Sequence, residues 1–215
     1  LLEGQSNPTI APYAKTGEVH FRITAKAADE KEADRLIEPV IRYMYRVFGD
    51  KIFATSEEVA LEDAVVELLE EKGLTLTTAE SCTAGLLAGR IMNVAGASKV
   101  YNEGYITYSN EAKERILGVK HETLEKYGAV SARTAAEMAE GAAKAAKASA
   151  SVSVTGIAGP GGGTEEKPVG LVYVGCQVNG KTRTEELRFT GNRAKNREYA
   201  VVRALTILWE ELMVS

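Results

Sequence analysis

The sequence contains few of the residues on which metal centres and disulfide frameworks depend. Among its 215 residues are two cysteines, Cys82 and Cys176, and two histidines, His20 and His121. Two cysteines cannot form a disulfide framework or a four-thiolate zinc site, and two histidines are too few for a multi-histidine metal centre. We therefore expect no metal site, and a protein that works in the reducing cytoplasm.

Long apolar runs and an excess of one charge are also missing. No run approaches the roughly 18 consecutive apolar residues of a membrane-spanning helix, and the first residues lack the charged-then-apolar pattern of a signal peptide. The 26 Lys and Arg against 30 Asp and Glu give a net charge of -4, which provides no general attraction to nucleic acid or anionic lipid. The composition argues against a membrane protein and predicts no membrane partner.

Apolar residues are plentiful enough, at 45% of the chain, to bury a core. Residues 1–15 contain two prolines and no periodicity, which predicts an irregular lead-in or linker. Apolar and polar residues then alternate over 18–25, as in a half-buried strand. A helical spacing follows, and Pro39 interrupts it, so we expect the helix to kink or restart there. A short strand at 51–54 would complete a small α+β unit over residues 1–54.

Downstream, the pattern changes to alternating strands and helices. Thr55 and Glu58 resemble a capping box for a helix that stops at Gly73. The Asn179-Gly180 pair between two apolar runs is a strong hairpin signal. These features predict an α/β domain over residues 55–215, in which helices flank a mixed sheet. The expected strands are 74–79, 104–108, 150–155, 171–178 and 181–189, and the later helices are 83–93, 110–117, 131–148 and 196–213.

A first candidate for chemistry is Ser81, at the junction between an expected strand and an expected helix. A serine there stands at a helix N-terminus, where free backbone N–H groups and the helix dipole favour a developing oxyanion. The alternative is that Ser81 only caps the helix. Cys82 is a competing nucleophile, but the sequence shows no partner that could activate a thiol, so we interpret it as buried packing.

A second candidate is Lys113, in the first turn of the helix expected after Tyr108. A cation is disfavoured at a helix N-terminus, which gives this lysine an electrostatic reason to release its proton more readily. A partly desolvated lysine of lowered pKa can activate a serine without histidine, and neither histidine has a readable partner. The alternative is an exposed lysine on a solvated helix.

A third candidate is the glycine-rich segment 155–164, which follows an expected strand. Its backbone N–H groups could surround a phosphate or carboxylate without steric hindrance. It is neither a Rossmann fingerprint nor a P-loop, because Thr164 stands where the fingerprint requires glycine and no GK[ST] sequence occurs. A flexible connector is the alternative. Arg193 and Arg197 could likewise meet an anion or remain solvated surface charges.

Four short motifs run through this second part of the chain: AESCTAG at 79–85, TYSNEAK at 107–113, GAVS at 128–131 and TGIAGPGG at 155–162. Their order and spacing resemble the CinA family (competence/damage-inducible protein) and its stand-alone relatives, the nicotinamide-nucleotide amidohydrolases, over roughly residues 56–215. Ala84 is a mild departure, since the family often has glycine at this position.

The upstream sequences NPTIAPYAK at 7–15 and GEV at 17–19 resemble the central KH-like segment of full-length CinA proteins. The family's N-terminal domain, similar to molybdopterin-binding domains, has no counterpart here, so the chain looks like a C-terminal part of a longer protein. Residues 1–52 contain eight basic and eight acidic residues and no GXXG loop. Since KH recognition uses a basic surface and that loop, we expect no nucleic-acid partner.

The resemblance implies hydrolysis of the carboxamide of nicotinamide mononucleotide to nicotinate mononucleotide and ammonia. Ser81 would be the nucleophile and Lys113 its base and proton shuttle, while Tyr108 would hydrogen-bond in the same relay or orient the lysine. An acyl-enzyme mechanism needs no cofactor, and the expected partner is the nucleotide substrate. The implied substrate-binding residues are Glu80, Thr83, Thr155, Gly156, Gly159, Gly161, Gly162 and Arg197.

Two further expectations concern assembly and catalysis. The alanine-rich face of the helix expected at 131–148 makes a homo-oligomer reasonable. The alternative to an enzyme is a non-catalytic module that senses a pyridine nucleotide in the same pocket; against it, Ser81, Tyr108 and Lys113 are all present.

Overall fold

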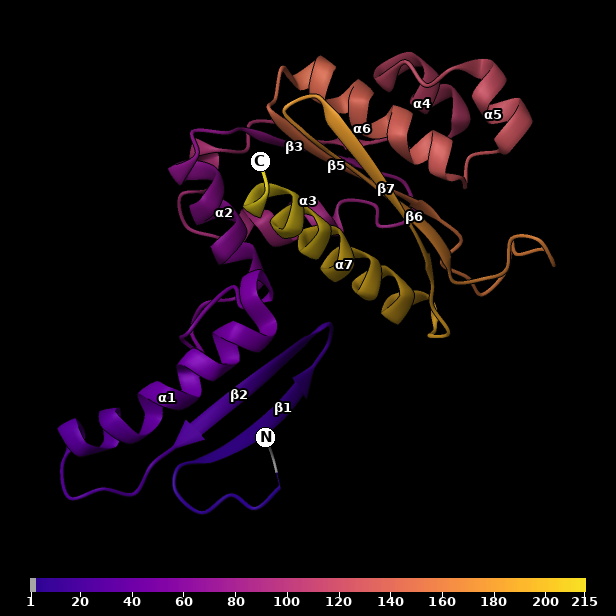
Figure 1. Cartoon of the computed structure of the whole chain (residues 1–215). Coiled ribbons are helices and arrows are strands. Elements are labelled where there is room, and N and C mark those ends of the chain that lie inside the picture. The colour runs from indigo at the N-terminus through magenta and orange to yellow at the C-terminus, as the bar shows by residue number, and fades with distance from the viewer. Residues whose placement is uncertain (1–2) are drawn as a thin grey trace. The chain divides into compact units, whose positions relative to one another are not determined.

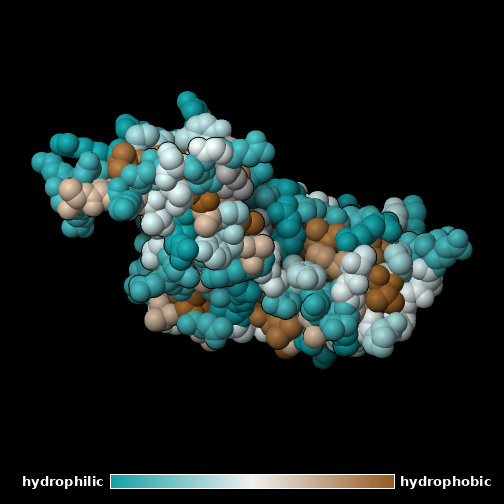
Figure 2. Space-filling model, turned by 90° about the horizontal axis from the view of Figure 1, so that it is seen from below, coloured by the Kyte–Doolittle hydropathy of each residue, from teal (hydrophilic) through white to brown (hydrophobic). Residues whose placement is uncertain are grey.

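The computed structural model describes residues 3–215, and the chain forms two compact units, residues 1–59 and 60–215 (Figure 1). Among the described residues, no helix is long and apolar enough to cross a membrane. On the face shown in Figure 2, apolar side chains lie in small separate groups between hydrophilic ones. This distribution is normal for a protein surface, on which single apolar side chains are common.

The N-terminal unit consists of an antiparallel β-hairpin and one long helix. Phe21 of the hairpin packs against Phe48 of the helix, with ring centroids 5.5 Å apart. Asp29 caps the helix by accepting a hydrogen bond from the backbone N–H of Glu32 at 2.8 Å. The elements are β1 (Thr9–Lys15), β2 (Glu18–Thr24), α1 (Glu30–Phe48) and a 3-10 turn, η1 (Gly49–Lys51).

Three sequence predictions for this unit are wrong, whereas the strand predicted at 18–25 is confirmed within one residue at its C-terminal end. Residues 9–15 form a strand instead of a linker, and Pro12 is tolerated because β1 is an edge strand. The helix continues without interruption through Pro39, so the predicted restart is wrong, while the alternative of a kink stays a prediction. Residues 52–54 have no regular structure, so the strand predicted at 51–54 is absent.

The C-terminal unit is built on a five-stranded mixed sheet covered by helices on both faces. Its strands are β3 (Leu76–Glu80), β4 (Tyr105–Ile106), β5 (Ala150–Gly156), β6 (Leu171–Val178) and β7 (Lys181–Arg188). Its helices are α2 (Leu61–Glu71), α3 (Leu86–Met92), α4 (Asn110–Leu117), α5 (His121–Tyr127), α6 (Ala132–Ala146) and α7 (Arg193–Met213), with a 3-10 turn η2 (Ala97–Lys99).

The strand order is β4-β3-β5-β6-β7, in which β3 runs parallel to β4 and β5, and the remaining pairs are antiparallel. α6 packs on one face of the sheet, with α4 and α5 against it (Figure 1). α7 covers the other face, and α2 and α3 lie beside α7. The predicted fold class, a mixed sheet flanked by helices with a small N-terminal α+β unit, is confirmed.

The alanine-rich helix α6 lies close to the sheet because small residues meet at the interface. The hydroxyls of Ser151 and Ser153 on β5 donate to the carbonyl oxygens of Ala139 and Ala135, at 2.7 and 2.6 Å. On β6, a Cβ at Gly175 would lie 2.4 Å from the Ala135 oxygen, which leaves room for glycine alone. The buried alanines of α6 are thus used inside the unit. A homo-oligomer stays a prediction that these alanines no longer support.

Element boundaries differ from the prediction where tertiary contacts decide them. The capping box predicted at Thr55 and Glu58 is not formed. α2 begins instead at Leu61, where the Asp63 carboxylate accepts from the backbone N–H of Ala60 at 2.9 Å. The short helix α5 was not predicted because its seven residues are mostly polar and show no helical apolar period. α7 begins three residues before its predicted start, with Asn192 as its cap.

Candidate active site

Ser81 directly follows β3, an interior strand whose five residues are all buried. Its backbone N–H donates to the carbonyl oxygen of Val154 on the neighbouring β5 at 2.9 Å. The serine retains 8% exposure. It does not cap α3, because that helix begins at Leu86 with Gly85 in the cap position. The sheet therefore holds the backbone N–H of Ser81 at the end of β3, and the alternative of a simple helix cap is wrong.

Lys113 lies on α4 and places its amine against Ser81. Nζ is 3.1 Å from Oγ of Ser81, 2.8 Å from the carbonyl oxygen of Thr107 and 3.1 Å from that of Tyr108. The lysine side chain is fully buried, so the alternative of an exposed lysine is wrong. α4 has the predicted boundaries, with Ser109 as its cap. The structure thus joins two of the three candidate segments through one direct contact.

Burial makes the amine of Lys113 easier to deprotonate than a lysine in water. Burial lowers the pKa of Lys113 to about 8, because a buried ammonium group loses its hydration. A neutral amine has two N–H donors and one lone pair. The carbonyl oxygens of Thr107 and Tyr108 can accept the two N–H donors, which leaves the lone pair for the Ser81 hydroxyl. In that state Ser81 donates to Nζ, and the pair is arranged to move the hydroxyl proton to the lysine.

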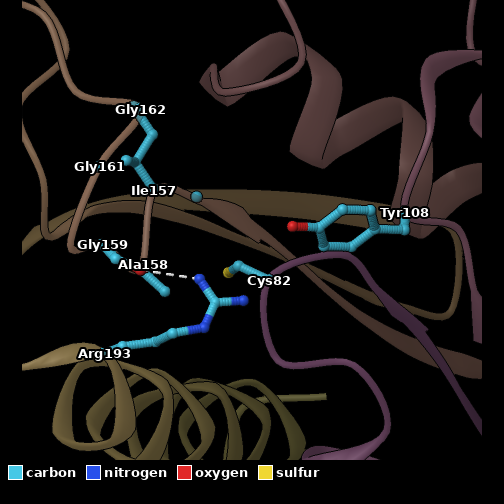
Figure 3. Close-up of a pocket in the computed structure, with 9 residues that line it drawn as sticks. Cys82, Tyr108, Ile157, Ala158, Gly159, Gly161, Gly162 and Arg193 are labelled. Atoms are coloured by element: carbon cyan, nitrogen blue, oxygen red, sulfur yellow. Dashed lines mark hydrogen bonds between the residues drawn. The ribbon is translucent and has the colours of Figure 1, made fainter.

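Tyr108 contributes to this arrangement through its backbone. Its carbonyl oxygen orients Lys113, but its side chain is 65% exposed. Among the described residues, no hydrogen bond joins the phenol to Ser81 or Lys113. Figure 3 shows the Tyr108 ring across the cavity from the glycine-rich segment, with its hydroxyl pointing toward that segment. The backbone of Tyr108 thus contacts Lys113, and the role that the resemblance implied for its phenol stays a prediction.

Glu80 uses its carboxylate to hold the start of α3. Its Oε2 accepts from the backbone N–H groups of Gly85 and Leu87 at 3.0 and 3.1 Å, and its Oε1 accepts from Ala88 at 2.8 Å. Glu80 is 1% exposed. The N–H groups of Gly85, Leu87 and Ala88 are therefore already bonded to the Glu80 carboxylate, and the role in substrate binding that the resemblance implied for Glu80 stays a prediction.

The turn between Ser81 and α3 requires two left-handed residues in succession. Ala84 has a φ of 52° and Gly85 has a φ of 91°. Glycine adopts this conformation freely, whereas a Cβ is disfavoured there. The backbone at Ala84 is therefore strained. Alanine in place of the glycine that the family often has here is less favourable than the sequence indicated. The same turn explains why α3 begins three residues later than predicted.

A cavity of about 190 Å³ is lined in part by Cys82, the residue that follows Ser81, while Ser81 and Lys113 are not among its lining residues. Its walls come from the turn after β3, the segment before α4, the glycine-rich segment after β5 and the start of α7 (Figure 3). Arg193 of α7 donates from Nη1 to the carbonyl oxygen of Gly159 at 2.8 Å. Ser81 directly precedes Cys82 in the sequence, and Cys82 forms part of the cavity wall. The lining residues are Cys82, Tyr108, Gly156, Ile157, Ala158, Gly159, Gly161, Gly162 and Arg193.

The glycine-rich segment is a shaped wall. A Cβ at Gly156 would lie 2.8 Å from the carbonyl oxygen of Leu171. Gly159 has a φ of 89°, and a Cβ there would lie 2.6 Å from Cγ1 of Val169. At Gly161, by contrast, a Cβ would meet nothing within 4 Å, so the space over this glycine is open to a ligand. The flexible-connector alternative does not fit these constraints, and the four predicted glycines all line the cavity.

Three other predicted substrate-binding residues do not line the cavity. The Thr155 hydroxyl donates to the carbonyl oxygen of Ala129 at 2.7 Å, Thr83 is fully buried, and Arg197 donates from Nη2 to the Thr83 carbonyl oxygen at 2.7 Å. Arg193 takes the place in the cavity that was predicted for Arg197. The spacing of four puts both arginines on one face of the helix, but only the packed structure shows which one reaches the cavity.

The remaining reactive side chains offer no competing site. Cys82 is a free, buried cysteine, and burial raises the pKa of its thiol to about 11, so it stays protonated at neutral pH. No cluster of three or more potential metal ligands occurs among the described residues. His20 lies 3.0 Å from Glu18 and His121 lies 2.9 Å from Glu114. The histidines therefore have partners that the sequence did not reveal, but neither pair includes the serine or the lysine.

Together these features define an α/β protein with a buried serine–lysine pair behind a glycine-walled cavity. The family profile of the CinA C-terminal domain matches residues 58–212, and that of the CinA KH domain matches residues 1–54. The chain therefore belongs to the CinA family, as the motifs indicated.

Relatives and solved structures agree with this assignment. A CinA-like protein of Kosmotoga olearia is 54% identical over 213 residues, which cover 99% of this chain and 52% of that protein. A competence-damage inducible protein of Clostridium novyi is 53% identical over 213 residues, or 99% of this chain and 51% of that protein. The chain thus spans about half the length of these curated relatives.

Among solved structures, the competence/damage inducible protein CihA of Agrobacterium tumefaciens has a TM-score of 0.69 and 44% identity. The match covers 71% of this chain and 93% of that one. A CinA superfamily protein of Klebsiella pneumoniae has a TM-score of 0.70 and 37% identity, and the match covers 72% of this chain and 97% of that one.

Proposed function

We propose that the C-terminal unit is an amidohydrolase that converts nicotinamide mononucleotide to nicotinate mononucleotide and ammonia. The observation that carries the proposal is the 3.1 Å contact between Oγ of Ser81 and Nζ of Lys113, a fully buried lysine whose pKa is lowered to about 8. A serine needs a base to become a nucleophile, and this amine is arranged to act as one near neutral pH.

The reaction divides into acylation and deacylation. Oγ of Ser81 attacks the carboxamide carbon while Nζ of Lys113 takes the hydroxyl proton. The resulting ammonium then protonates the amide nitrogen, the C–N bond breaks, and ammonia leaves an ester on Ser81. A water molecule attacks this ester and gives its proton to Lys113, which returns it to the serine oxygen as the acid departs. Amide and water become acid and ammonia, with no oxidation or reduction.

The cavity supplies groups that suit the rest of the nucleotide. The Arg193 guanidinium and the open backbone of the glycine-rich segment can hold a phosphate group through charge and N–H donors. The exposed ring of Tyr108 offers an aromatic face for the pyridine ring. Both features line the same cavity as Cys82, the residue that follows Ser81, which supports binding of the nucleotide near the proposed nucleophile.

The test is an assay of ammonia and nicotinate mononucleotide formed from nicotinamide mononucleotide by this chain and its Ser81→Ala variant. We expect the unaltered chain to turn over. The variant should lose about 10⁴-fold or more in kcat, because the nucleophile is removed, while its melting temperature and circular dichroism stay close to those of the parent. Binding of the nucleotide without ammonia release by the parent would favour the sensor alternative. Retained turnover in Ser81→Ala would show that another group is the nucleophile.

A further inference from the structure

The start of α7 reaches two separate loops of the site. Asn196 donates from Nδ2 to the carbonyl oxygen of Ala158 in the glycine-rich segment at 3.1 Å. The next residue, Arg197, donates from Nη2 to the carbonyl oxygen of Thr83 at 2.7 Å. Thr83 lies two residues after Ser81, so one helical turn holds both the segment that carries the nucleophile and the segment that forms the wall of the cavity.

α7 is held in place by its packing against the sheet. Beyond its first turn the helix packs on β5 and β6, and residues such as Ala200, Ala204 and Leu205 are completely buried. The two loops follow β3 and β5 respectively, and each leaves the sheet before it reaches the cavity. A rigid helix that bonds to both loops therefore sets the distance between them.

The two side chains are not explained by packing alone. Asn196 is fully buried, yet its Oδ1 has no hydrogen-bond partner among the described residues. Nε of Arg197 is likewise buried and unpartnered within the described part of the chain. A buried polar atom without a partner destabilises a fold, and an apolar side chain of similar shape would avoid that cost. What these polar side chains add is the bond that each makes to a loop carbonyl.

We infer that Asn196 and Arg197 are positioning residues with separable effects, an inference that rests on the proposed function. Arg197 fixes the turn that carries Ser81, so its loss should disturb alignment of the nucleophile and lower kcat with little change in KM. Asn196 fixes the glycine-rich wall, so its loss should weaken nucleotide binding and raise KM with little change in kcat. Neither residue touches the reacting atoms.

The test compares Asn196→Leu and Arg197→Met with Asn192→Ala as the matched control. Asn192 caps the same helix by accepting from the backbone N–H of Lys195 at 3.0 Å and bonds to neither loop. We expect Arg197→Met to lower kcat by up to about 100-fold, since small misplacements of reacting groups have effects of that size. We expect Asn196→Leu to raise KM about tenfold, the loss of one well-placed interaction. Asn192→Ala should lower the melting temperature and leave both constants near their original values.

Two further measurements do not depend on turnover. The rate at which a fluorophosphonate probe labels Ser81 should fall in Arg197→Met and stay unchanged in Asn196→Leu. Binding of nicotinate mononucleotide, measured by calorimetry on the Ser81→Ala background, should weaken only with the Asn196 change. If Asn196→Leu fails to fold, Asn196→Ala, which also removes the donor and adds no bulk, serves instead.

The outcomes separate the two proposals. Equal effects of the Asn196 and Arg197 changes on both constants, or effects no larger than those of Asn192→Ala, would overturn the positioning roles. Absence of nicotinamide mononucleotide turnover in the parent chain would overturn the proposed function. In that case the rates of Ser81 labelling in the two variants still test the role of Arg197. Slower labelling in Arg197→Met but not in Asn196→Leu would support alignment of the serine by Arg197.

Discussion

The two ends of the candidate site differ in their contact with water. At one end Lys113 is fully buried and Ser81 is 8% exposed. At the other end Tyr108 is 65% exposed, and Gly161 and Gly162 lie at the surface. The first end is suited to proton transfer and the second to admitting a ligand.

The difference shows what burial does for the chemistry. A lysine in water would remain an ammonium group near its ordinary pKa and could not accept a proton from serine. Enclosure removes that hydration, and the carbonyl oxygens of Thr107 and Tyr108 keep the amine's donors satisfied. The ligand end has the opposite requirement, because a nucleotide must enter and leave. One small site therefore needs a closed part and an open part.

Among the tests of this comparison between the two ends, the largest expected effect comes from removing the amine at the closed end. Lys113→Met keeps an unbranched apolar side chain of similar length, so the core should remain packed. Loss of the general base should lower kcat by about 10² to 10⁴-fold. The measurement is kcat for ammonia release, with thermal melting as the folding control. Lys113→Arg should be similarly inactive because a guanidinium stays protonated. Near-normal turnover in Lys113→Met would remove the serine–lysine scheme.

A second expected effect is a pH dependence that belongs to the closed end. Protonated Lys113 has no lone pair, so kcat/KM should rise with pH and level off above a midpoint near the lowered pKa of about 8. The measurement is a pH profile between about 6 and 10. The same group affects stability: its pKa is lower in the folded state, so the unfolded chain holds more protons between the two pKa values. The free energy of unfolding therefore gains from this group as the pH rises above about 8. A flat rate profile would contradict the assignment of the base.

A smaller effect is expected at the open end. Tyr108→Phe should change kcat by less than about threefold, because the phenol forms no hydrogen bond with Ser81 or Lys113 among the described residues. Tyr108→Ala removes the aromatic wall and should raise KM about tenfold while kcat stays within about threefold. Steady-state kinetics of the two variants decide between a wall and a relay. A large loss of kcat in Tyr108→Phe would restore the phenol relay.

The smallest effect is expected at Cys82, which lines the cavity beside Ser81. Its thiol is buried and protonated at neutral pH, because burial raises its pKa to about 11. Cys82→Ser should leave kcat within about twofold of the parent value. The measurement is the rate of ammonia release by the variant. In addition, the parent should react slowly with thiol reagents. An inactive Cys82→Ser variant with an unchanged melting temperature would indicate a thiol mechanism instead.

Much of the fold could be predicted from local patterns. The hairpin around Asn179-Gly180 and the boundaries of α4 follow from a turn signal and a cap within a few residues of each element. β1 could not be predicted because Pro8 directly before it, Pro12 within it and its mostly exposed side chains hide any alternation. α5 has no apolar period of its own and is placed by packing against α6.

For the site, the motifs indicated Ser81, Lys113 and the glycine-rich segment. They could not show that Glu80 would hold the start of α3, or that Arg193 rather than Arg197 would line the cavity. Those outcomes depend on which groups lie nearby once the chain has folded.

The sequence by itself determined the chemical types available to this protein: a serine after a strand, a lysine near a helix start, and a glycine-rich segment after another strand. Only the tertiary structure decided that Lys113, 32 residues from Ser81 along the chain, lies 3.1 Å from its hydroxyl and away from water. The physical reason is that proton affinity depends on solvation and neighbours, and both are properties of the packed chain.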